Sequence, residues 1–154
     1  MPWASRPRTA PLTARLMWYG LRSRMGPRAM RRRGFLGLVM PPGPIDDPEG
    51  LAARLAEWFG HDLADQPPVA AEQLRALRAS DLFGRLGELA GLPTVVATGR
   101  HDPIAPPSAG RRLAGAIPGA RSVEVDEASH GLPLTHVAHT NALLDEHFRQ
   151  GSSL

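Results

Sequence analysis

The sequence predicts an α/β protein in which a mostly helical first part precedes a short parallel sheet. Apolar residues recur at helical spacing between residues 12 and 90, whereas apolar, β-branched runs occupy 92–98 and 120–125. Strand, helix, strand and helix follow one another within 91–149, which indicates a right-handed βαβα unit. With 154 residues and 42% hydrophobic content, the chain suffices for one domain with a core.

The chain divides into four segments. Residues 1–11 contain three prolines and no periodicity, so we expect an irregular lead-in there. Residues 12–90 form the helical region, residues 91–149 the βαβα unit, and residues 150–154 a tail. No repeat or low-complexity tract interrupts this order.

Glycine and proline divide the helical region into helices. We expect one helix over 12–25 and a basic one over 28–39, because Gly26 and Pro27 interrupt the first and the prolines within 40–44 stop the second. A third helix begins with Asp47 as N-cap and Pro48 in its first turn, and it ends at Gly60. Its expected apolar anchors are Leu51, Leu55, Trp58 and Phe59.

Two more helices complete this region. One opens at Pro67 and Pro68 and carries Ala70, Leu74 and Leu77 on one face. Ser80 is expected to cap a short helix with apolar residues Leu82, Phe83, Leu86 and Leu89.

The βαβα unit contains two further helices. Pro106, Pro107 and Ser108 lead a helix whose apolar side carries Leu113, Ala116 and Ile117. A last helix over 135–148 has Val137, Leu143, Leu144 and Phe148 as expected anchors.

The positive charge lies at the start of the sequence. Residues 1–45 carry nine arginines and no acid, while residues 46–154 carry nine arginines and fifteen acids. The arginines of 28–33 could bind phosphates of a nucleic acid or an anionic lipid. No zinc-knuckle spacing or aromatic-interleaved strand supports nucleic-acid binding, so a solvated helix face is the favoured interpretation.

Composition excludes several classes of protein. The absence of cysteine excludes disulfide scaffolds, thiolate metal sites and a cysteine nucleophile. No apolar run approaches the ~18 residues that span a bilayer, so no membrane association and a cytoplasmic location are expected. His136 and His139, with Asp145 and His147 nearby, lack a third ligand on the same helix face, so we expect no metal and no cofactor.

An acid and a histidine follow the two expected strands. Asp102 comes after the first strand and His130 after the second, 28 positions further on. Loops at the carboxyl ends of neighbouring parallel strands share one edge of the sheet, so the two side chains can approach each other. A carboxylate beside an imidazole fixes its tautomer and stabilises the imidazolium that forms when histidine accepts a proton. Taken singly, Asp102 before Pro103 could simply form a turn.

Three motifs carry a family resemblance. Gly99 to Pro106 (GRHDPIAP), Ala116 to Arg121 (AIPGAR) and Ala128 to Gly131 (ASHG) resemble, in order and spacing, the carboxyl-terminal third of the α/β-hydrolase fold family. The resemblance implies that Asp102 is the triad acid and His130 the triad base. It further implies that residues 12–90 are the helical cap that such enzymes insert before their last strands.

Two parts of that chemistry are absent from the sequence. No serine lies in a G-x-S-x-G elbow, and no His-Gly-Gly-type oxyanion segment occurs. The family order places the nucleophile before the acid, so the missing part is expected upstream of residue 1, in a longer or a complementing amino-terminal half. The complete hydrolase would act on a small-molecule ester, lactone or similar carbonyl substrate, and we expect no efficient esterase activity from this chain alone.

Two other interpretations remain open at this point. The chain could be a non-catalytic hydrolase remnant that binds a protein through its cap or an exposed sheet edge. It could also be a basic module that binds an anion through residues 1–45. Within the hydrolase interpretation, Trp58, Phe59, Leu74, Leu77 and Phe83 are candidate substrate-binding residues, although helical spacing fits a packed cap equally well.

Overall fold

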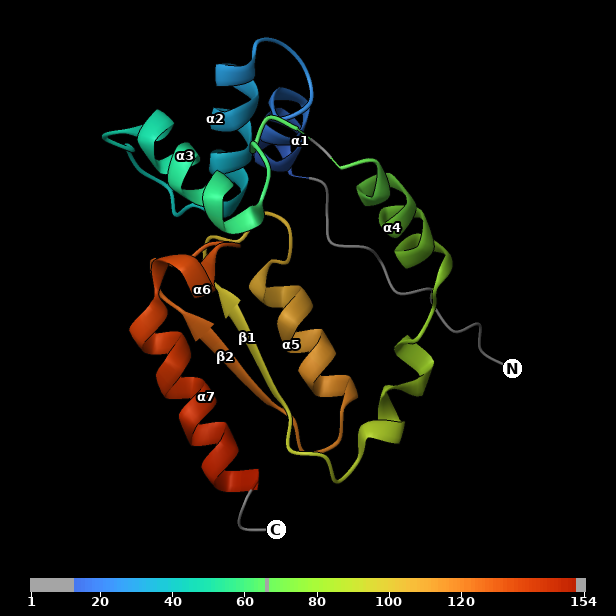
Figure 1. Cartoon of the computed structure of the whole chain (residues 1–154). Coiled ribbons are helices and arrows are strands. Elements are labelled where there is room, and N and C mark those ends of the chain that lie inside the picture. Colours follow the sequence, from blue (N-terminus) through green and yellow to red (C-terminus); the bar gives the residue numbers. More distant parts are fainter. Residues whose placement is uncertain (1–12, 66, 152–154) are drawn as a thin grey trace.

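The computed structural model describes residues 13–65 and 67–151, so the expected lead-in over 1–11 and the end of the tail lie outside the described residues (Figure 1). The helical region contains α1 (Ala14–Arg22), α2 (Arg28–Val39), α3 (Pro48–Phe59), α4 (Pro68–Ala79) and the 3-10 helix η1 (Phe83–Leu89). The remainder contains β1 (Val95–Gly99), α5 (Pro107–Ala116), β2 (Arg121–Val125), α6 (Leu132–Thr135) and α7 (Val137–Gly151). The predicted order of helices and strands is confirmed, except that the short helix α6 was not predicted.

The two strands form a parallel sheet, as predicted. Their register pairs Val95 with Arg121 and Gly99 with Val125. Both strands point toward α1, α2 and α3, while α5 and α7 flank the sheet and α4 lies to one side (Figure 1). Side chains alternate along β1, since Thr98 faces α5 at Gly110 whereas Ala97 lines a small hollow with residues of α7.

Capping residues define the ends of α1 and α3; the caps of α3 agree with the prediction, whereas Thr13 lies inside the helix expected over 12–25. The Thr13 side chain accepts a hydrogen bond from the Leu16 amide (3.1 Å) at the start of α1. Asp47 accepts one from the Gly50 amide (2.8 Å), and Gly60 ends α3 in the left-handed conformation with φ of 72°. Proline at the first turn of α3 completes the predicted pattern.

The prediction that Ser80 caps the start of the helix after α4 is wrong. Its hydroxyl donates to the Ala76 carbonyl (2.9 Å), and it therefore ends α4 instead of starting the next helix. Asp81 instead accepts a hydrogen bond from the Phe83 amide (3.3 Å). The free carbonyls in the last turn of α4 lie within reach of the Ser80 hydroxyl, whereas η1 begins three residues further on.

The main core lies among α2, α3 and the segment after α3. Leu36, Ala52, Leu55 and Leu63 are buried together, and Leu134 of α6 packs against them. The prediction that Trp58 and Phe59 are buried anchors is wrong, because the two residues are 68% and 43% exposed. The buried face of α3 is centred on Ala52 and Leu55, which leaves Trp58 at its margin.

Other expected anchors are also solvent-exposed. Burial on α5 falls on Ala114 and Ile117, the second of which was predicted, while the expected anchor Leu113 is exposed. The remaining exposed anchors lie on α4, at or just before the start of η1, and on α7: Leu74, Leu77, Leu82, Phe83, Val137, Leu144 and Phe148. Among the described residues, nothing covers these faces sufficiently to bury them, so an apolar period identified the helices correctly but not their buried sides.

Ion pairs fix α2 against α3 and the segment after it. Arg28 contacts Asp62 and Asp65, each at 2.9 Å. Arg32 contacts Glu49 at 3.0 Å and also Asp62. The hydrogen bond from Arg32 and another from the Ala64 amide hold the pKa of Asp62 far below its usual range. Much of the basic run that could have bound phosphates is therefore paired within the protein.

Glycine allows α1 and α2 to approach closely. A Cβ atom at Gly34 would lie 2.6 Å from the carbonyl carbon of Arg22, and one at Gly37 would collide with the Tyr19 ring. Gly20 of α1, by contrast, has open space where a Cβ would lie.

No helix in the described part of the chain combines the length and apolarity that crossing a membrane requires.

We predict opposite effects of alanine at Gly34 and at Gly20. Both substitutions favour a helix by roughly 0.5–1 kcal/mol, but Gly34→Ala also forces α1 from α2, at a cost of ~1–3 kcal/mol. Urea unfolding should show Gly34→Ala to be less stable than the unsubstituted chain and Gly20→Ala to be equally or more stable. Equal stabilisation by both would contradict the close packing of these helices.

Candidate active site

The loops after β1 and β2 meet at the carboxyl ends of the strands. The Arg100 amide donates to the Val125 carbonyl (3.0 Å) and the His101 amide to the Ala128 carbonyl (2.9 Å). A Cβ atom at Gly99 would lie 2.6 Å from the carbonyl carbon of Ala128, so the two backbones approach more closely than any side chain permits. Sequence reasoning missed this role of Gly99, although a glycine at the end of a strand is a signal of close backbone approach.

Asp102 is held rigidly within its loop. Its side chain is 6% exposed, and its Oδ1 accepts hydrogen bonds from the amides of Ile104 (2.7 Å) and Ala105 (2.8 Å). These contacts also make Asp102 the turn former that its position before proline suggested. Because both bonds go to Oδ1, the other oxygen is available to a partner across the gap.

His130 is that partner. Its Nδ1 lies 2.9 Å from Oδ2 of Asp102, and Nδ1 is the donor because a carboxylate can only accept. The His130 side chain is 41% exposed, and among the described residues its Nε2 has no hydrogen-bond partner. Beneath it, the buried Ser129 hydroxyl donates to the His101 carbonyl (3.3 Å). The arrangement holds the imidazole at one nitrogen and leaves the other free for proton transfer.

The pair has a definite electrostatic consequence. The hydrogen bond to Asp102 raises the pKa of His130 above its usual 6.5, more strongly than desolvation lowers it. The attraction of the carboxylate for the imidazolium adds to the increase in pKa. Asp102 therefore stabilises the protonated form of His130, as a base that must accept a proton requires.

The helical region touches the histidine loop directly. The Gly131 amide donates to the Val39 carbonyl at the end of α2 (2.6 Å), and a Cβ at Gly131 would lie 2.7 Å from that oxygen. Leu134, just beyond this contact, belongs to the main core. The end of α2 is thus fixed beside His130.

The five candidate substrate-binding residues do not meet in one pocket among those described, and Leu77 on α4 is exposed. Phe59 borders a hollow of about 250 Å³ with Phe35 and His61. Trp58 lies at the exposed margin of α3, Leu74 on α4 and Phe83 on η1, the last two also exposed.

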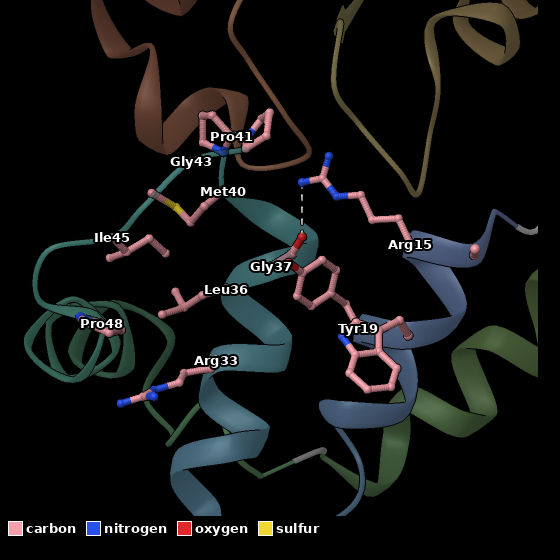
Figure 2. Close-up of a pocket in the computed structure, with 13 residues that line it drawn as sticks. Arg15, Tyr19, Arg33, Leu36, Gly37, Met40, Pro41, Gly43, Ile45 and Pro48 are labelled. Carbon is pink, nitrogen blue, oxygen red and sulfur yellow. Dashed lines mark hydrogen bonds between the residues drawn. The ribbon is translucent and has the colours of Figure 1, made fainter.

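A larger hollow was not anticipated from the sequence. It measures about 720 Å³ and lies between α1, α2 and the segment from Met40 to Pro48 (Figure 2). Tyr19 and Leu36 contribute to its wall. The proline-rich segment over 40–44 is the sequence feature that could have indicated this hollow, because prolines end the helix and direct the chain away from it, which leaves space beside the helix end.

The remaining histidines do not form a metal centre in the described part of the chain. His136 Nδ1 lies 2.8 Å from the Thr135 hydroxyl, and His147 lines the small hollow beside β1. Within residues 13–65 and 67–151, no three histidine, aspartate or glutamate side chains are grouped so as to hold a metal ion.

Two curated proteins resemble the chain in sequence. It is 37% identical over 87 residues to the rhodomycin D methylesterase DauP of Streptomyces sp. (strain C5) and 48% identical over 85 residues to the rhodomycin D methylesterase DnrP of Streptomyces peucetius. Each match covers 55% of this chain and 24% of the relative, so the matched segment spans about a quarter of those proteins. No protein-family model matches the chain.

Solved structures resemble most of the chain. The non-heme bromoperoxidase BpoC from Mycobacterium tuberculosis H37Rv superposes with a TM-score of 0.69 at 18% identity, over 89% of this chain and 53% of that one. A thermophilic esterase from Thermogutta terrifontis gives a TM-score of 0.59 at 22% identity, over 93% and 53%.

The chain thus spans about half the length of these structures. Its helical first part and its two parallel strands with their helices correspond to part of a larger fold. The chain therefore has a partial α/β-hydrolase fold, and it is similar in sequence to two methylesterases and in structure to an esterase.

Proposed function

We propose that Asp102 and His130 are the acid and the base of a hydrolase that cleaves an ester, a lactone or a similar carbonyl substrate. The observation that carries the proposal is the 2.9 Å hydrogen bond between two side chains that separate loops bring together. The carboxylate is buried and fixed by two backbone amides, while the imidazole presents its second nitrogen outward. This geometry suits proton transfer at a neighbouring nucleophile.

In the proposed reaction, Nε2 of His130 accepts the proton of the nucleophile as that atom attacks the substrate carbonyl. Asp102 stabilises the resulting imidazolium, which then protonates the leaving alcohol. In the second half of the reaction, His130 activates a water molecule in the same way. The water attacks the acyl group held on the nucleophile and releases it as the carboxylic acid. The nucleophile and the oxyanion-hole donors would come from sequence beyond these 154 residues, in the same polypeptide or in a complementing one.

The relatives support an ester as the substrate class. Both curated relatives are named methylesterases, and one superposed structure is an esterase, which favours a methyl ester among the possible carbonyl substrates. We further propose that residues 12–90 act as a helical cap, because the end of α2 contacts the histidine loop through Val39 and Gly131.

The pKa of His130 provides a test on the chain as it stands. We expect imidazole NMR titration to give a pKa above 6.5 and Asp102→Asn to lower it, because the variant removes the negative charge. The corresponding stabilisation is fully present below pH 6.5 and is lost as the pH rises through the raised pKa. His139→Ala on α7 serves as a control that leaves the His130 titration unchanged. An unshifted titration in Asp102→Asn would contradict the pairing.

A second prediction concerns the isolated chain. Without a nucleophile elbow, it should hydrolyse 4-nitrophenyl acetate and simple methyl esters no faster in the unsubstituted form than in His130→Ala. Saturable hydrolysis that disappears in His130→Ala would show that this sequence carries its own nucleophile.

The reaction itself can be tested in a chimera. The amino-terminal part of DauP, joined to this chain where the two sequences align, should hydrolyse a methyl ester. Asp102→Asn or His130→Ala should then lower kcat by about three to four orders of magnitude, while His139→Ala should have no effect. A folded, active chimera that tolerates both site variants would refute the assignment.

A further inference from the structure

The hollow between α1 and α2 combines an apolar wall with a positive charge. Trp18 and Tyr19 of α1 line it together with Leu36 of α2. Met40 and Ile45, from the segment after α2, line the same space (Figure 2). Its volume of about 720 Å³ lies within the range of sites for small organic molecules, ~300–1,000 Å³. Among the described residues, no aspartate or glutamate lines it, whereas Arg15 and Arg33 both do.

Arg15 is the more informative of the two arginines. Its half-buried guanidinium reaches from α1 toward α2, where one nitrogen donates a long hydrogen bond to the Gly37 carbonyl (3.4 Å) (Figure 2). It also lies 5.9 Å from the centre of the Tyr19 ring. In the described part of the chain, Arg15 makes no ion pair with a carboxylate, and the sequence contains no acid before Asp46.

A guanidinium in this position retains unused binding capacity. It carries five N–H donors in a planar arrangement that matches both oxygens of a carboxylate. Arg33 on the opposite wall differs, because its Nε lies 3.7 Å from Glu49 and is already partly neutralised. The unmatched positive charge of the hollow therefore belongs mainly to Arg15.

We infer that this hollow binds a hydrophobic organic acid, whose ring system contacts Trp18 and Tyr19 and whose carboxylate pairs with Arg15. Apolar walls bury the ring, and charge-assisted hydrogen bonds select an acid over a neutral compound of the same shape. A hydrophobic acid is also the product class of ester hydrolysis, and that link alone rests on the proposed function. Binding itself requires neither a nucleophile nor the Asp102–His130 pair.

The test uses the full 154-residue chain and a matched pair of probes. The probes are 4-cyclohexylbenzoate and its uncharged counterpart 4-cyclohexylbenzyl alcohol. Trp3→Phe and Trp58→Phe leave Trp18, in the wall of the hollow, as the one tryptophan, so its fluorescence reports local binding. Titrations at pH 8 and low ionic strength keep the acid ionised and the ion pair unscreened.

The acid should change Trp18 emission saturably and bind at least about tenfold more tightly than the alcohol. Arg15→Met should abolish that preference, Arg15→Lys should retain part of it, and Arg54→Met on α3, outside the hollow, should retain all of it. Equal affinity for acid and alcohol in the Arg15-containing chain, or no acid binding up to millimolar concentration, would overturn the proposal. Neither result depends on hydrolysis, so failure here remains distinct from failure of the proposed activity.

Discussion

The position of the candidate site depends on how closely two backbone segments approach at the ends of β1 and β2. Parallel pairing in register aligns Gly99 with Val125, so both following loops leave the sheet at the same level. With no side chain at Gly99, the backbone around Ala128 settles directly against it. The loop after β1 then donates backbone hydrogen bonds to the end of β2 and to the loop that follows it, and Asp102 and His130 come within 2.9 Å of each other. This backbone contact is what brings together a carboxylate and an imidazole that lie 28 positions apart in the sequence.

The helical region is built by a different means. Arginines of α2 bind acids from α3 and from the segment after it, while Gly34 allows α1 to lie directly on α2. These contacts create two features at once. They neutralise much of a basic run, and they leave beside α2 a hollow in which the charge of Arg15 has no acidic counterpart among the described residues. The positive charge of the first 45 residues therefore includes arginines that are paired within the protein and one, Arg15, that is available to a ligand.

The sequence sufficed to predict elements whose signals are local. Asp47, Pro48 and Gly60 mark α3 because capping and left-handed termination are properties of single residues. Asp102 and His130 could be paired because parallel topology brings the ends of adjacent strands together. Packing between helices could not be predicted in the same way: Trp58 has the spacing of a core residue, yet the centre of the α3 interface falls on Ala52 and Leu55. The hollow beside Arg15 likewise depends on the helix crossing and on the course of the proline-rich segment, neither of which has a one-residue signature.

The hydrogen bond from Gly131 to Val39 joins the helical region to the histidine loop at one backbone amide. That amide proton can exchange with solvent deuterium only when the end of α2 separates from the loop or when the whole protein unfolds. Its exchange rate therefore measures how often the end of α2 separates from the histidine loop. A rate that follows global unfolding means that the helical region and the sheet form one cooperative unit, whereas a faster rate means that the helices separate while His130 stays in place. The exchange rate of the Gly131 amide thus shows whether the helices move away from the imidazole of His130 without global unfolding.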